Sequence, residues 1–176
     1  MEMPADPPSR SRRAAEYVPP KNWADPEEVI AESRAFIRAL SRADKIAFFS
    51  AVGAMLTCVL PWKETSTEGE IIGLVCMGLI TFLAALACAI AVIFRVRDVL
   101  PRTNPLFLRL TQMLAAATAT LWSLVFIPMS YDGKMVTSSI GNLQVALSRP
   151  SYGAVFGVVL SGVAAGGTLM SLKERR

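Results

Sequence analysis

Four long apolar runs, separated by shorter polar segments, dominate the chain. They cover residues 46–62, 71–94, 106–128 and 153–172. At about 1.5 Å per residue, a helix of about 20 residues crosses a bilayer core about 30 Å thick. The first run is the shortest and crosses only if the preceding segment extends its helix. Because a backbone in lipid must satisfy its own hydrogen bonds, and period-2 alternation is absent, we expect an all-α membrane protein with four spans rather than a β-barrel.

The segment before the first run predicts an amphipathic helix over residues 25–45. Asp25 is a good capping residue, Pro26 suits the first turn, and acidic residues follow where the helix dipole favours them. On a helical wheel the apolar residues share one arc, and a basic ridge of Arg34, Arg38 and Arg42 lies on the other side, with Lys45 beside this ridge. We expect this helix to bind the anionic inner leaflet, where each basic residue contributes about 1 kcal/mol. The alternative is a helix that packs under the bundle or on a partner.

Basic residues divide unequally between the two sides that four spans create. Fifteen of the 18 Lys and Arg residues fall on one of these sides. They lie in the N-terminal 45 residues, between the second and third runs, at Arg109 just inside the third run, and in the tail 173–176. The positive-inside rule therefore predicts that both termini are cytoplasmic, and Trp62, Tyr131 and Tyr152 fall at the predicted outer boundary. The N-terminal 45 residues balance eight basic against eight acidic residues, so we expect no binding to nucleic acid. Residues 1–24 are proline-rich and lack an apolar stretch, which predicts disorder.

The two outer segments differ in length. Residues 63–70 are short and predict only a turn. The outer loop 129–152 is longer than a connection requires, which makes it the part best suited to a specialised role. We expect a short helix there with Ile140, Leu143 and Leu147 on one face, ended by Pro150. The alternative is a two-stranded hairpin around the tight-turn signal Asp132–Gly133.

The fourth run has a marked pattern of small residues. Two series recur every four residues and share the last helix: Gly153, Gly157, Ser161 and Ala165 in one, Gly162 and Gly166 in the other. Small residues at this spacing let two helix backbones approach closely in lipid. One interpretation is tight packing inside a single four-helix bundle. The other is that one face serves this chain and the second face serves a partner.

Composition narrows the chemistry. The chain is 53% hydrophobic and 18% charged, it has no histidine, and its mean hydropathy is +0.44. No Asp, Glu or Lys lies inside a run, which disfavours proton-coupled transport. Arg109 lies just inside the third run, where we expect it to snorkel to the boundary; the alternative is an anion or lipid-headgroup site. We therefore expect no catalytic residues, no metal site and no cofactor.

Two of the three cysteines share a predicted depth. Cys58 and Cys76 lie about 6–8 Å from the outer boundary on consecutive antiparallel helices. We interpret them as small apolar residues, and the alternative is a facing thiol pair that forms a disulfide.

Short motifs link the chain to a known kind of protein. Asp44-Lys45 precedes the first run, Leu60-Pro61-Trp62 closes it, and Tyr152-Gly153 opens a glycine-rich last helix. Across about residues 44–172 this pattern resembles small four-helix inner-membrane proteins that are widespread in bacteria and often lack an assigned function. Many of those proteins carry an N-terminal zinc ribbon, for which this chain lacks the cysteines. The resemblance implies a multi-pass protein of the bacterial inner membrane.

These observations together predict a non-enzymatic integral membrane subunit. We expect it to associate with a partner membrane protein, or with itself, through the small-residue face of the fourth span. We also expect residues 1–45 to engage lipid or a cytoplasmic partner. The alternative function is a small oligomeric channel or transporter.

Overall fold

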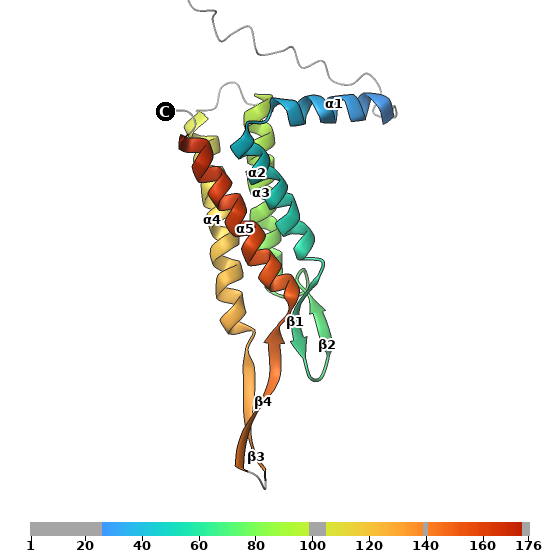
Figure 1. Ribbon diagram of the computed structural model, residues 1–176, viewed down its shortest axis with the longest axis vertical. Coiled ribbons are helices and arrows are strands. Elements are labelled where there is room, and N and C mark those ends of the chain that lie inside the picture. Colours follow the sequence, from blue (N-terminus) through green and yellow to red (C-terminus); the bar gives the residue numbers. More distant parts are fainter. Residues whose placement is uncertain (1–25, 99–104, 139–140, 174–176) are drawn as a thin grey trace, which may run out of the picture.

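Four helices run side by side, a small sheet extends from one end of this bundle, and a fifth helix, α1, projects sideways from the other end (Figure 1). The computed structural model describes residues 26–98, 105–138 and 141–173. The predicted disordered segment 1–24 and tail residues 174–176 lie outside the described residues. The elements are α1 (Pro26–Ala39), α2 (Arg42–Thr57), β1 (Pro61–Thr65), β2 (Gly69–Ile72), α3 (Gly78–Arg97), α4 (Pro105–Met129), β3 (Asp132–Ser138), β4 (Gly141–Pro150) and α5 (Tyr152–Lys173).

Three of the described helices are long and apolar enough to cross a membrane. These segments, Gly78–Arg97, Leu106–Met129 and Tyr152–Lys173, have mean hydropathies of 2.5, 1.6 and 1.8. The expectation of a mainly helical protein of the membrane type is therefore confirmed. The predicted third and fourth runs agree closely with α4 and α5, whereas α2 has only 16 residues.

The first two apolar runs were predicted with helices that are too long. α2 ends at Thr57, because Val59 and Leu60 donate their N–H groups three residues back, at 3.1 Å each, and so tighten the chain into a turn. Pro61 then begins β1, where its missing N–H does not matter. In the second run Ile71 and Ile72 pair in β2, so α3 begins only at Gly78. The expectation that residues 63–70 form only a turn is also wrong, because residues 63–65 and 69–70 pair within the β1–β2 hairpin.

The predicted helix over residues 25–45 is interrupted at Leu40–Ser41. Ser41 has an extended backbone (ψ 166°), and its hydroxyl accepts the Asp44 N–H at 3.1 Å, which makes Ser41 the N-cap of a new helix. Arg34 and Arg38 therefore belong to α1, whereas Arg42 and Lys45 belong to α2. The expectation of one continuous basic ridge is wrong, because this cap changes the direction of the chain.

The two connections beyond the bundle form one antiparallel sheet in the order β2-β1-β4-β3. β3 pairs with β4 from Asp132↔Ser148 to Ser138↔Gly141, so the expected short helix in 129–152 is wrong. The alternative hairpin is correct in kind, but Asp132–Gly133 begins its first strand instead of forming its turn. β1 pairs with β4 through Glu64↔Arg149, which joins the two hairpins. Figure 1 shows that the β3–β4 ribbon extends well past β1 and β2.

A bidentate ion pair marks the junction between the hairpins. Arg149 donates hydrogen bonds to Glu64, from Nε to Oε2 at 2.9 Å and from the terminal nitrogen to Oε1 at 3.1 Å. These bonds raise the pKa of the Arg149 guanidinium above its ordinary value, so it stays charged. Since both side chains are well exposed, the pair aligns the strands more than it stabilises them.

The bundle is packed mainly with small side chains. One cluster contains Ala51, Cys88, Ala89, Ala116 and Ala164, so the four helices approach closely at that level. A second cluster lies next to the sheet and centres on Trp62, which is fully buried.

Glycines provide the space for the Trp62 indole. A Cβ at Gly73 would come 2.7 Å from the ring, at Gly153 2.9 Å, and at Gly157 2.8 Å. The centroids of the Trp62 and Phe126 rings lie 5.2 Å apart, and the indole Nε1 donates a hydrogen bond to the Thr57 carbonyl at 2.8 Å. We call this set of three glycines the Trp62 recess. The recess joins β1 to the start of α5 and to the segment before α3.

α2 and α5 remain in contact toward the opposite end of the bundle. A Cβ at Gly167 of α5 would come 2.8 Å from the Ala47 nitrogen, and one at Gly53 of α2 would come 3.1 Å from Leu160. Gly157, at the other end of α5, belongs to the Trp62 recess and lies beside Thr57, the last residue of α2. α2 therefore lies along most of the length of α5.

We expect Gly157→Ala to lower the free energy of unfolding by about 1–3 kcal/mol, because the new methyl group overpacks the Trp62 recess. Gly166→Ala is the matched control, since a Cβ there meets nothing within 4 Å; it should leave stability unchanged or raise it by up to about 1 kcal/mol. Unfolding in mixed detergent micelles measures both. If both substitutions change the free energy of unfolding equally, the Trp62 recess does not restrict the size of the side chain at residue 157.

Candidate functional site

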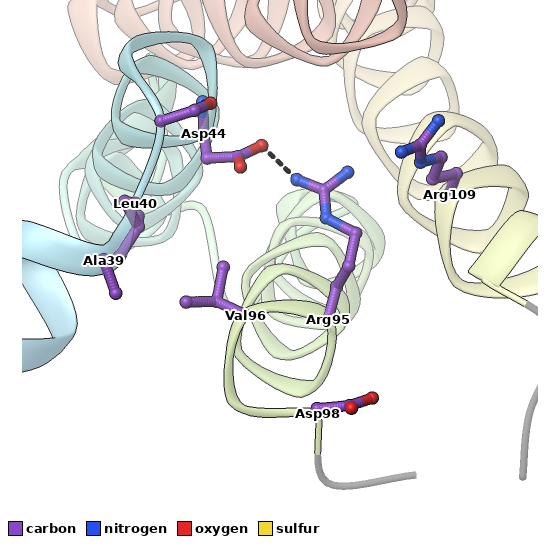
Figure 2. Close-up of a pocket in the computed structure, with 8 residues that line it drawn as sticks. Ala39, Leu40, Asp44, Arg95, Val96, Asp98 and Arg109 are labelled. Atoms are coloured by element: carbon purple, nitrogen blue, oxygen red, sulfur yellow. Dashed lines mark hydrogen bonds and ion pairs between the residues drawn. The ribbon is translucent and has the colours of Figure 1, made fainter. Parts of the chain in front are cut away.

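A polar pocket lies at the end of the bundle that faces away from the sheet. Its volume is about 420 Å³. It is lined by Ala39, Leu40 and Ser41 at the α1–α2 junction, Asp44 of α2, Arg95, Val96 and Asp98 at the end of α3, and Arg109 of α4. Figure 2 shows Arg95 and Arg109 projecting from different helices toward the space between them. We call this the junction pocket.

The wall of the junction pocket holds a buried ion pair between Arg95 and Asp44 (Figure 2). Their side chains are only 10% and 5% exposed. The start of α2 fixes the carboxylate, because Asp44 occupies the first turn after the Ser41 cap. Arg95 Nε is also buried, and no acceptor for its hydrogen bond lies within the described part of the chain. The ion pair therefore leaves donor capacity of the guanidinium unused.

The charges that line the junction pocket are balanced. Two guanidinium groups, of Arg95 and Arg109, face two carboxylates, of Asp44 and Asp98. Asp98 ends α3 in the left-handed conformation (φ 49°), and its N–H bonds the Phe94 carbonyl. Arg109 is half-buried and lines the pocket, so the structure places it beside other charged groups at the predicted inner boundary.

A further buried polar group lies one turn from Arg109 on α4. Gln112 is fully buried, and its amide nitrogen lies 3.4 Å from the Thr168 hydroxyl of α5. Its Oε1 has no hydrogen-bond partner among the described residues. A buried acceptor of this kind costs about 1–3 kcal/mol. The half of the bundle that faces away from the sheet is therefore more polar than a count of charged residues in the apolar runs indicates.

Sequence reasoning missed Asp44, Arg95 and Gln112 as site residues. Asp44 precedes the first run and Arg95 follows the second, so both are expected at the inner boundary, but nothing in their spacing shows that they meet. The spacing between Arg109 and Gln112 was a usable signal, because residues three apart lie on one helix face.

The predicted small-residue interface divides into two parts. Gly153, Gly157 and Ser161 are buried within the chain, and Ala165 packs on the alanine cluster. Gly162 and Gly166 differ from them. A Cβ at Gly162 would touch only Thr120, at 4.0 Å, and one at Gly166 would meet nothing within 4 Å.

The predicted lipid-headgroup residues do not line the junction pocket. Arg34, Arg38 and Arg42 are exposed, and Lys45 is half-buried. Phe36, on the apolar arc of α1, contacts Phe48 of α2 with ring centroids 5.5 Å apart. Phe36 therefore packs on the bundle, whereas Val29, Ile30 and Ile37 of the same arc are exposed.

Ionic contacts also hold α1 against the end of α3. Arg97 pairs with Glu32 at 2.8 Å, and its guanidinium lies 5.6 Å from the centre of the Phe36 ring.

Cys58 and Cys76 lie in the same cluster around Trp62, and both thiols are free in this structure. Cys58 Sγ donates to the carbonyls of Ala54 at 3.3 Å and Gly78 at 3.4 Å, and Cys76 Sγ donates to Gly73 at 3.3 Å. Each thiol thus has backbone acceptors of its own, and the disulfide stays an untested alternative.

No protein-family model, curated protein or solved structure matches this chain. The resemblance to small bacterial inner-membrane proteins therefore stays a prediction.

We expect Asp44→Asn to destabilise the protein by about 3–5 kcal/mol, because it leaves the Arg95 charge buried without its partner. The double variant Asp44→Leu/Arg95→Met removes both charges and should recover most of this loss. Unfolding in mixed micelles measures both variants. If the double variant is as unstable as the single one, the ion pair is not the cause.

Proposed function

We propose that this chain is a small non-enzymatic integral membrane subunit that binds a second transmembrane helix, from a partner protein or another copy, through Gly162 and Gly166 of α5. The observation that carries the proposal is the open space beside these two glycines. Two glycines four residues apart on a membrane helix form a shallow groove into which another helix packs by dispersion and Cα–H···O contacts.

This proposal narrows the interface expected from the sequence. Gly153 and Gly157 are committed to the Trp62 recess, and Gly167 is committed to α2. A second helix has no access to these three positions while the bundle is intact. Packing inside this chain does not require glycine at positions 162 and 166. We infer that contact with a second helix is the reason for the small residues there.

We further propose that α2 is a fourth span and that both termini are cytoplasmic in a bacterial inner membrane. α2 lies along α5, which supports a similar depth for the two helices. The charge bias toward the α1 end of the bundle supports the orientation. In this arrangement α1 lies along the inner leaflet with Arg34 and Arg38 at the headgroups, and the sheet projects outside.

Gly166→Leu tests the interface. We expect it to weaken association at least about tenfold, or about 1.4 kcal/mol, because the leucine fills the groove. The folded monomer should persist, since a Cβ at this position meets nothing within 4 Å in its own chain. Self-association in micelles and co-purification from native membranes are the two readouts.

The matched control is Ala87→Leu, which adds the same bulk at an exposed position on α3. This control should leave association unchanged. If Gly166→Leu behaves like Ala87→Leu in both assays, the proposed interface is wrong.

A further inference from the structure

We propose that the junction pocket binds a phosphoethanolamine group, presented as the headgroup of a membrane phospholipid. This site is separate from the α5 interface, and its main binding residue is Arg95. That side chain is nine-tenths buried, forms the pocket wall, and has a buried Nε donor with no acceptor among the described residues. A buried donor without an acceptor is rare in proteins, and the cavity that the Arg95 side chain lines, of about 420 Å³, has the size of a small-molecule site.

Phosphate is the acceptor that suits the guanidinium groups. Arg95 and Arg109 come from different helices and both line the cavity (Figure 2). A guanidinium offers several N–H donors in one plane, a geometry that fits phosphate oxygens. The Asp44 ion pair holds Arg95 in place, so little side-chain entropy remains to be lost on binding.

The carboxylates argue for a headgroup that also carries a primary amine. Asp44 and Asp98 line the same cavity, so a headgroup that is only anionic meets two negative charges together with two positive ones. A primary ammonium donates up to three hydrogen bonds to such carboxylates, whereas a quaternary ammonium donates none. The balanced charges therefore favour phosphoethanolamine over phosphoglycerol and phosphocholine.

The position of the pocket favours a lipid as the source. It lies where α3 ends in two arginines, at the level proposed for the inner headgroups. Leu40 and Val96 supply apolar surface beside the charged groups, as needed where a headgroup joins its acyl chains.

Binding of defined lipids to the full-length protein in detergent, followed by native mass spectrometry, tests the proposal. The probes are phosphatidylethanolamine, phosphatidylglycerol and phosphatidylcholine with identical acyl chains. We expect phosphatidylethanolamine to bind at least about tenfold more tightly than the other two. Equal or tighter binding of phosphatidylglycerol would overturn the proposal.

Two variants locate the site. Arg109→Gln should weaken phosphatidylethanolamine binding about tenfold. Asp98→Asn, at an exposed position, should reduce the preference over phosphatidylcholine. Lys173→Gln, which removes an exposed charge at the end of α5 and outside the pocket lining, is the control and should change neither quantity. If Lys173→Gln matches Arg109→Gln, the lipid is held by surface charge and the pocket assignment fails.

Water-soluble phosphoethanolamine and inorganic phosphate distinguish the possible sources. At concentrations equal to the lipid, both should leave the lipid bound. If soluble phosphoethanolamine displaces it molecule for molecule, the ligand is a free phosphate ester and the lipid assignment is wrong. All of these outcomes are independent of Gly166→Leu, which does not touch the pocket.

Discussion

The burial of one indole, that of Trp62, is the constraint on which the rest of the structure depends. Its ring needs glycine at 73, 153 and 157, and its N–H needs the Thr57 carbonyl. Each requirement ties a different segment to the same point. Once they are met, the end of α2, the start of α5 and the strand β1 are fixed relative to one another, and β1 is placed to pair with β4.

That arrangement gives the two ends of the bundle different chemistry. At the sheet end, the apolar cluster around Trp62 and the backbone pairing of two hairpins leave few unsatisfied groups. At the opposite end, the α1–α2 break brings Asp44 toward Arg95 and opens a cavity among charged side chains. Between them, small residues hold the helices close together, and a Cβ at Gly162 or Gly166 would meet almost nothing in its own chain.

The sequence predicted the helices well where an apolar run is long enough to cross a bilayer, as in α4 and α5. It failed at residues 141–147 because Leu143 and Leu147 fit a helical face while Leu143, Val145 and Leu147 fit a strand, and a segment this short does not separate the two periods. Ile140, the third residue of that predicted face, lies outside the described residues. It failed at Ile71 and Ile72 because hydropathy does not distinguish a buried helix from a paired strand. The glycines of α5 were found from their spacing, but only their contacts separate Gly157 from Gly166. The ion pair joins residues 51 positions apart, a relation that no local pattern encodes.

If α2 crosses the membrane beside α5, as we propose, the sheet and α1 lie on opposite sides of the membrane. This topology is tested most directly by labelling single cysteines with a membrane-impermeant maleimide in intact cells, after the three native cysteines are replaced by alanine. Thr67→Cys, between β1 and β2, and Arg38→Cys, on α1, are both at exposed positions. We expect Thr67→Cys to be labelled from outside and Arg38→Cys to be labelled only after permeabilisation. Labelling of both from the same side would show that α2 does not cross the membrane.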